Sequence, residues 1–312
     1  MKVRNIIVLA LGSCILALTG CNKDKLGNTV FPDVPVLDES SATYEFDKYL
    51  KENYLDPYNI SFQYKLGDET TDMDYNLVPV TYEKAQIVAH AVKYLWLDVY
   101  QKQVSDKEFL AKYTPRILNI LGSPAINAAQ GTETLGVAEG GIKITLYNMN
   151  GIDLTDIEWL NKYIFHVMHH EFSHILHQTK TFPKDYKLLS AGLYDSQAWQ
   201  YRSDEEAYSL GFVTPYSMSE AHEDFVEVIS SYITDTRETW ADRGFNFAED
   251  HTHIVSYDEN KEGAPMINTK INMCKEWLIE KYGFELDSIR AEVQRRQDAL
   301  TYDVVMNDSY GK

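Results

Sequence analysis

Apolar residues recur with the period of an α-helix along much of the chain, and one such stretch is long and uninterrupted. Between residues 163 and 178 neither proline nor glycine occurs, and the apolar positions include Ile164, Val167, Met168, Ile175 and Leu176. Apolar side chains at this spacing line one face of a helix that packs into a core. The pattern therefore predicts a largely buried helix over residues 163–178.

The same periodicity predicts further helices over residues 44–54, 81–100, 106–113, 203–211, 220–234, 267–281 and 286–299. Thr81 and Ser219 are the expected N-caps of two of them, and Gly283 separates the last two. Strands are expected near 60–66, over 116–121 and over 142–147, with segments 122–133 and 241–266 as loops. Helices that enclose a few strands predict an α+β fold with a small mixed sheet and a helical C-terminal lobe.

The amino-terminal pattern differs from the rest of the chain. Lys2 and Arg4 precede an apolar run that ends in Leu-Thr-Gly-Cys, which resembles the signal of bacterial lipoproteins. We expect residues 1–20 to be a signal peptide, with Cys21 lipidated and residues 21–42 a flexible tether. Residues 43–312 then form one domain with two lobes around a cleft. The expected location is the cell envelope, with the lipid as membrane anchor; a plain signal peptide cleaved elsewhere is the alternative.

Charge and cysteine content narrow the classes of function. The chain carries a net charge of −18, which becomes −20 once Lys2 and Arg4 leave with the signal. Such a charge disfavours binding to nucleic acid or to anionic lipid. After Cys14 and Cys21 are set aside, Cys274 is the single cysteine of the expected domain, so a disulfide within it is excluded. Its apolar neighbours favour a small core residue over a nucleophile.

Candidate chemistry is concentrated on the long central helix, which carries five of the nine histidines. Residues 170–174 read His-Glu-Phe-Ser-His, an HExxH motif. Side chains four residues apart share a helix face, so His170 and His174 can bind one Zn²⁺ ion. Zinc lowers the pKa of bound water, and Glu171 is placed to remove a proton from that water as general base. A structural histidine-rich helix is the alternative.

The third ligand is expected on another helix. The longer motif HExxHxxGxxH requires glycine and histidine where this chain has His177 and Lys180. Downstream, Glu223 and Glu227 are four residues apart on the predicted helix 220–234 and share one face. Our preferred assignment is Glu223 as the ligand, with Glu227 and His166 supporting the site from behind the ligands. The reverse assignment of the two glutamates, or Asp224 as the ligand, stays open.

Tyr216, seven residues before Glu223, is a candidate catalytic residue, since a phenol there could donate a hydrogen bond to a developing oxyanion. The chain has 22 tyrosines, so a packing role is the alternative. The HExxH helix, the segment Glu-Asp-Phe-Val-Glu at 223–227 and the lipidation signal together resemble the zinc-binding metallopeptidase lipoproteins of Bacteroidetes. These proteins are similar to gluzincins.

The resemblance implies a zincin-like fold, a bound Zn²⁺ ion and hydrolysis of peptide bonds in a peptide or protein substrate. In zincins the strand before the active-site helix lines the cleft, so Ile142, Ile144 and Leu146 become candidate substrate-binding residues. A plain sheet strand is the alternative there. Two other functions stay open: a non-catalytic surface lipoprotein that binds a glycan or protein, and a zinc hydrolase for another amide or ester, such as a peptidoglycan cross-link.

Overall fold

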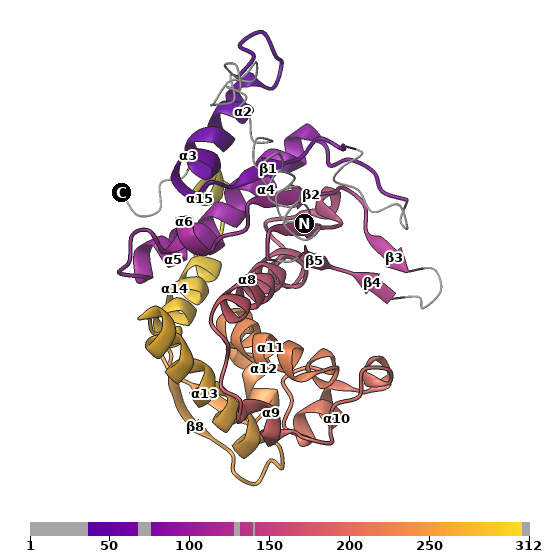
Figure 1. The fold of residues 1–312 in the computed structure, drawn as a ribbon, viewed down its shortest axis with the longest axis vertical. Coiled ribbons are helices and arrows are strands. Elements are labelled where there is room, and N and C mark those ends of the chain that lie inside the picture. The colour runs from indigo at the N-terminus through magenta and orange to yellow at the C-terminus, as the bar shows by residue number, and fades with distance from the viewer. Residues whose placement is uncertain (1–36, 68–75, 128–131, 140, 308–312) are drawn as a thin grey trace, which may run out of the picture. The chain divides into compact units, whose positions relative to one another are not determined.

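The computed structural model describes residues 37–67, 76–127, 132–139 and 141–307. The chain divides into two compact units, Met1–Tyr44 and Glu45–Lys312. In the described part of the first unit, the Asp38 carboxylate accepts a hydrogen bond from the Ser40 backbone N–H at 2.9 Å. The expected signal peptide, the lipidated Cys21 and most of the tether lie outside the described residues. The ribbon of the second unit is shown in Figure 1.

The second unit contains a four-stranded mixed sheet in the order β1-β2-β6-β5. These strands are β1 (Ser61–Gln63), β2 (Ile117–Ile120), β6 (Lys143–Leu146) and β5 (Gly136–Glu139). β1, β2 and β6 are parallel, and β5 is antiparallel to β6. Four apolar side chains of the two inner strands are almost fully buried (Leu118, Ile120, Ile144 and Leu146), and Ile117 at the start of β2 is half-buried. The three strands predicted from the sequence are present, and the fold is of the mixed α and β class.

The position of β6 corrects one prediction. This strand lies between β2 and β5 and pairs with both, so it has no free edge for an extended peptide. Ile144 and Leu146 are fully buried in the core, while Ile142 precedes the strand and is 58% exposed. Of the two edge strands, β1 and β5, β5 is the one that lines a cavity beside α8 (His166–Thr179), and its segment Gly-Val-Ala-Glu gave no strand signal.

The amino-terminal helices lie at the predicted positions; the first two helical runs extend beyond the predicted ends, and α6 (Phe109–Tyr113) is shorter than predicted. The Thr81 side chain accepts a hydrogen bond from the Lys84 backbone N–H and so caps the predicted helix. That helix continues through a π-helical turn to Gln103 rather than ending at Tyr100. The segments in order are α2 (Tyr44–Leu50), η1 (Lys51–Leu55), α3 (Asp56–Tyr58), α4 (Tyr82–Val92), η2 (Lys93–Leu97), α5 (Asp98–Gln103) and α6 (Phe109–Tyr113).

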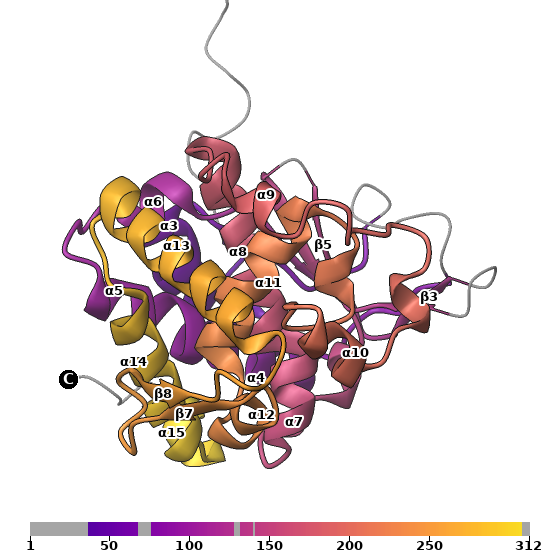
Figure 2. The ribbon, with the colours of Figure 1, turned by 90° about the horizontal axis from the view of Figure 1, so that it is seen from below.

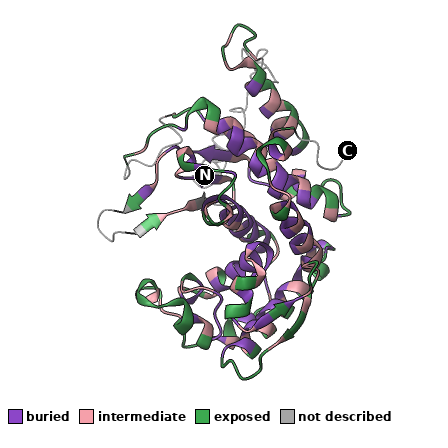
Figure 3. Ribbon diagram, turned by 180° about the vertical axis from the view of Figure 1, so that it is seen from behind, coloured by how far each residue is buried: buried purple, intermediate pink, exposed green. Residues whose placement is uncertain are grey.

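Two helices, α8 (His166–Thr179) and α11 (Ala221–Thr234), pack against each other and are buried over most of their length (Figure 3). α8 continues a helical run from α7 (Ile157–Leu160) and η4 (Asn161–Phe165), so the predicted central helix starts six residues earlier than expected. Ser219 is not the N-cap of α11. It has helical backbone angles at the end of a preceding turn, whereas Glu220 is extended and takes the cap position.

Two long helices lie near the positions predicted for the carboxyl-terminal part of the chain. α13 (Ala264–Tyr282) and α14 (Leu286–Asp298) pack against α11 (Figure 2). Gly283 ends α13 with a φ angle of +74°, in the left-handed region that glycine adopts without steric cost. Cys274 on α13 is fully buried, which confirms its prediction as a core residue. The remaining helical segments are η3 (Met149–Gly151), α9 (Tyr186–Leu189), η5 (Trp199–Tyr201), α10 (Asp204–Ser209), η6 (Tyr216–Met218), α12 (Arg237–Asp242) and α15 (Tyr302–Met306).

Two segments predicted as loops contain β-hairpins. The first holds β3 (Ala125–Asn127) and β4 (Thr132–Thr134), and the second holds β7 (Phe245–Phe247) and β8 (Ile254–Tyr257). Both segments are rich in polar and turn-forming residues, which favoured the prediction of loops. No helix in the described part of the chain is long and apolar enough to cross a membrane.

Candidate metal centre

The histidines of the HExxH motif lie on α8, on the side that faces α11. His170 and Glu171 are 7% and 8% exposed, so both are largely withdrawn from solvent. Apolar side chains on the remaining faces of the helix, including Met168 and Phe172, are fully buried and fix its position. Buried histidines need partners for their ring nitrogens, because an unpaired polar group in a core is costly. For His170 and His174, α11 supplies the carboxylates of Glu223 and Glu227 as partners.

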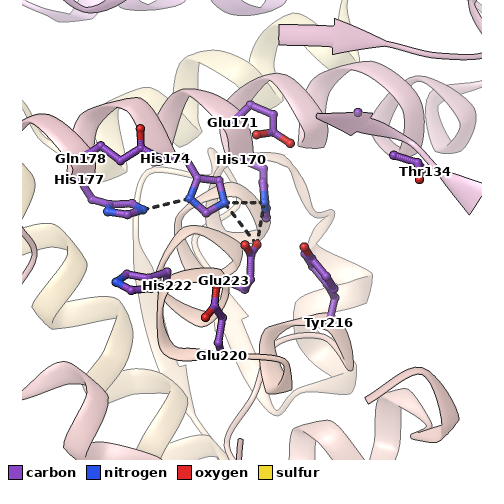
Figure 4. Close-up of a pocket in the computed structure, with 11 residues that line it drawn as sticks. Thr134, His170, Glu171, His174, His177, Gln178, Tyr216, Glu220, His222 and Glu223 are labelled. Carbon is purple, nitrogen blue, oxygen red and sulfur yellow. Dashed lines mark hydrogen bonds and ion pairs between the residues drawn. The ribbon is translucent and has the colours of Figure 1, made fainter. Parts of the chain in front are cut away.

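Three ring and carboxylate atoms converge at one point between the helices. The Nε2 atom of His170 is 3.1 Å from the Nε2 atom of His174 and 3.1 Å from an oxygen of Glu223. The same oxygen of Glu223 is 3.3 Å from Nε2 of His174. Ligand atoms of all three residues lie within 4.8 Å of one another, as a shared cation requires (Figure 4).

Glu223 and His170 perturb each other's protonation. Burial opposes the charge on His170, but hydrogen bonds with Glu223 and Glu227 outweigh it and raise the pKa of His170 to about 10. Burial likewise opposes the charge on Glu223, yet its hydrogen bonds with the two histidines hold its pKa well below the usual range. A metal ion must displace the proton that these carboxylates stabilise on the imidazole.

Glu227 binds the opposite side of His170. One of its oxygens lies 2.7 Å from Nδ1 of His170 and 2.7 Å from Nε2 of His166. Its other oxygen accepts a hydrogen bond of 2.6 Å from the Thr214 hydroxyl. His166, His170 and Glu227 form a second group with the spacing of metal ligands. Because Glu227 is 3% exposed and both its oxygens have partners, we assign this group to orienting His170.

Asp224 points away from the histidines. Its carboxylate forms an ion pair of 2.7 Å with Lys270, and both side chains are fully buried. The Tyr194 hydroxyl donates a hydrogen bond of 2.9 Å to the same carboxylate oxygen. Of the three acidic residues left open by the sequence, Glu223 is the one whose carboxylate meets both motif histidines.

A cavity of about 560 Å³ opens beside the converging ligands. Glu171 lines it together with the three residues of the candidate metal site, and so does the edge strand through Gly136. A Cβ atom at Gly136 would lie 2.2 Å from a methyl carbon of Val167, so glycine permits this close approach of β5 to α8. The lining residues are Thr134, Gly136, His170, Glu171, His174, His177, Gln178, Tyr216, Glu220, His222 and Glu223 (Figure 4).

Tyr216 lies on the wall of this cavity, in the turn η6 just before α11. Its ring centroid is 5.9 Å from that of His170 and 4.9 Å from that of Trp199. Burial, followed by the nearby carboxylates of Glu223 and Glu227, raises the pKa of Tyr216 above its usual value. The phenol therefore stays protonated and can donate a hydrogen bond into the cavity.

The sequence interpretation did not assign a role to His177 or His222. The Nδ1 atom of His174 is 3.0 Å from Nε2 of His177, and the rings of His177 and His222 stack with centroids 5.5 Å apart. Burial and the neighbouring histidines lower the pKa of His177 to about 4, so its neutral ring can accept a hydrogen bond from His174. The three-residue spacing from His174 to His177 was the available signal, since such residues are neighbours on a helix surface.

The described fold and site define a metallopeptidase-type domain of the mixed α and β class. A family model described as "putative zinc-binding metallo-peptidase" matches residues 39–287, and the chain belongs to this family. A crystal structure of a protein from Bacteroides caccae with the same description has 38% sequence identity and a TM-score of 0.68. The match covers 85% of this chain and 96% of that one. A search of curated proteins gives no match.

The donor set fits the metal in the description of the family. Two imidazole nitrogens and one carboxylate oxygen are a common ligand set for catalytic zinc, and a fourth position is left for water or substrate. The expected ligands His170, His174 and Glu223 supply this set beside a cavity. Family membership does not favour the alternative of a purely binding lipoprotein.

Proposed function

We propose that this protein is a zinc-dependent peptidase of the zincin type, with zinc held by His170, His174 and Glu223. The observation that carries the proposal is the convergence of these three side chains on a cavity that Glu171 also lines. When bound there, zinc supplies Lewis-acid activation of water and of a carbonyl group. The family description supports both the metal and the reaction class.

In this proposal Glu171 is the general base. It follows His170 on α8, is largely buried and faces the same cavity as the ligands, where it can hold a proton taken from water. A carboxylate in this position can then deliver the proton to the amine that leaves when the peptide bond breaks. Tyr216, protonated and on the cavity wall, donates a hydrogen bond to the oxygen of the reacting carbonyl group as negative charge develops there.

We further propose that the substrate is a peptide in extended conformation. In the described residues β5 is an edge strand of the four-stranded sheet and contributes Gly136 to the cavity wall. The free edge of a strand offers backbone donors and acceptors that an extended peptide can pair with. This assignment replaces Ile142, Ile144 and Leu146 as the substrate-binding strand.

The amino-terminal sequence supports a second part of the proposal, which concerns location. We propose that residues 1–20 are removed, that Cys21 carries lipid, and that the peptidase domain is attached to the cell envelope through the tether. The basic start, the apolar run and the cysteine at its end carry this proposal.

The mechanism is tested by Glu171→Gln, which keeps the size of the side chain but removes the base. We expect the variant to bind zinc normally and to lose at least about a hundredfold in kcat on a cleaved peptide, the usual scale of general-base catalysis. His170→Ala should lose bound zinc. Glu205→Gln, an exposed residue on α10, is the matched control and should keep full activity.

Zinc content by elemental mass spectrometry and a peptide-library cleavage assay supply the two readouts. Undiminished turnover by Glu171→Gln would show that another group acts as base. A wild-type chain that binds zinc but cleaves nothing would instead favour the non-catalytic alternative.

A further inference from the structure

Thr214 lies in the loop between α10 and α11, and its side chain joins two parts of the site. Its hydroxyl is 2.6 Å from one oxygen of Glu227 and 3.1 Å from the backbone nitrogen of Ser217. Glu227 contacts His170 from behind, and Ser217 follows Tyr216 in the turn η6. The Thr214 hydroxyl therefore contacts both Glu227, which orients the candidate ligand His170, and the turn that carries Tyr216.

The direction of these hydrogen bonds follows from the chemistry of the groups. A hydroxyl has one proton to donate and can accept through its lone pairs. The Ser217 backbone N–H can only donate, so it donates to the Thr214 oxygen, and the Thr214 proton is directed to Glu227. A second pair of bonds, from the Ser217 hydroxyl to the Thr214 carbonyl oxygen (2.6 Å) and from the Thr214 N–H to the Ser217 hydroxyl (3.2 Å), fixes the turn.

This hydrogen bond sets the orientation of the Glu227 carboxylate. One oxygen of Glu227 serves both His166 and His170, each at 2.7 Å, and the other receives the Thr214 proton. A carboxylate held at both oxygens cannot rotate about its terminal bond without losing a charge-assisted hydrogen bond in a buried setting. That carboxylate orients the ring of His170. Mutation of a group that orients a metal ligand typically lowers metal affinity 10- to 100-fold.

We propose that Thr214 is a positioning residue that orients His170 through Glu227 and fixes the turn that presents Tyr216 to the cavity. The inference about Tyr216 rests on the proposed peptidase function. The inference about His170 concerns zinc affinity and can be tested without any substrate.

The test compares Thr214→Val, which keeps the shape but removes the hydroxyl, with Thr214→Ser, which keeps the hydroxyl. Thr81→Val is the matched control. The Thr81 hydroxyl also accepts a hydrogen bond from a backbone N–H at the start of a helix, but Thr81 forms its hydrogen bonds with residues such as Lys84 and Asn150, which are not site residues. The zinc dissociation constant is measured by competition with a chromophoric chelator, and folding is checked by circular dichroism. If Thr214→Val folds poorly, Thr214→Ala gives the same comparison.

We expect zinc binding to weaken about tenfold or more in Thr214→Val, and to change less than about threefold in Thr214→Ser and Thr81→Val. In a Glu227→Gln background the same change at 214 should have less than about a threefold effect, because the carboxylate through which it acts is gone. Normal zinc affinity in Thr214→Val, or an equal loss in both backgrounds, would overturn the proposal. Zinc binding without peptide cleavage by the wild type would overturn the peptidase assignment alone.

Discussion

Replacing Lys270 with methionine is expected to destabilise the domain strongly, because it leaves a buried carboxylate without its cation. Lys270 lies on α13, and its ammonium group forms the ion pair of 2.7 Å with Asp224 at the start of α11. It also donates a hydrogen bond of 2.8 Å to the carbonyl oxygen of Gly211. Both charged side chains are fully buried, so water cannot replace either partner.

The expected loss in the free energy of unfolding is about 3–5 kcal/mol, the usual result of removing one member of a buried ion pair. Domains have about 5–15 kcal/mol in total, so the loss is a large fraction of the stability. At about 2–4 °C per kcal/mol for a domain of this size, the melting temperature should fall by about 6–20 °C. Asp224→Asn should cost a similar amount, because it leaves the Lys270 charge unpaired.

The double variant Asp224→Asn/Lys270→Met separates the penalty of an unpaired charge from the value of the pair. With both charges gone, the remaining cost is the lost hydrogen bonds, each about 1 kcal/mol. The double variant should therefore be more stable than either single variant, with a coupling energy of about 2 kcal/mol or more.

Urea unfolding followed by circular dichroism, with a chelator present, measures these differences without a contribution from bound zinc. Lys281→Met on the same helix is the control, since its ion pair with Glu280 is exposed and should contribute at most about 1 kcal/mol. A loss below about 1 kcal/mol in Lys270→Met, or strict additivity of the two single changes, would refute the reasoning.

Two further predictions concern pH and the amino terminus. Burial opposes the charge on Glu292, but hydrogen bonds from Arg295, Lys102 and Arg296 outweigh it and lower the pKa of Glu292 to about 2. The ionised Glu292 therefore stabilises the fold fully above its ordinary pKa of 4.5, and this stabilisation is lost as the pH falls from there towards 2. In urea unfolding, the difference in stability between wild type and Glu292→Gln should shrink between about pH 5 and pH 3. A difference that stays constant with pH would contradict this. Cys21→Ser should abolish incorporation of labelled palmitate and release the protein from the envelope fraction of cells, whereas Cys274→Ala should retain the label; labelling of the Cys21→Ser variant would rule out the proposed anchor.

Helices were predictable where their apolar periodicity was long. α4 to α5, α8, α11, α13 and α14 all carry apolar stripes over three or more turns. Thr81 marks a start through its side-chain cap, and Gly283 marks an end through its positive φ angle. The strands β3, β4, β5, β7 and β8 were not predicted. Their segments lack the apolar runs that indicated β2 and β6, and each strand is stabilised by a pairing partner, which is a tertiary property that the local sequence does not contain.

The error about the substrate-facing strand arose because β6 pairs with β2 and β5 along both edges, and the expected exposure of one of its faces also failed. Alternation of apolar and polar residues over 142–147 indicated a strand with one solvent-exposed face. Thr145 lies on that face, but its side chain is only 2% exposed. Tyr147 on the same face is also buried, where it packs with Leu121 and Ala125, whereas Lys143 is half-buried. Whether a polar face is buried depends on tertiary neighbours, which cannot be identified from the sequence of the strand itself.

The choice among Glu223, Asp224 and Glu227 depended on the register of two helices. Along α8 the histidines 166, 170 and 174 rise by one turn each, and along α11 Glu223 and Glu227 are one turn apart. The contacts pair His166 with Glu227, and His174 with Glu223, so the helices run antiparallel. A slip of about 5.4 Å, one helical turn, would move Glu227 to the position of Glu223.

The sequence of the two helices allows either register, because both glutamates share one face. The packing of other residues decides between them. Phe225 stacks on Phe182 with ring centroids 4.6 Å apart, and the side-chain amide of Asn161 donates to the carbonyl oxygen of Thr234 at the far end of α11. Thr214 then meets Glu227, while the other glutamate, Glu223, faces the cavity. The sequence therefore predicts which face of α11 carries the acidic site residues. The separate roles of Glu223 and Glu227 follow from contacts at both ends of α11.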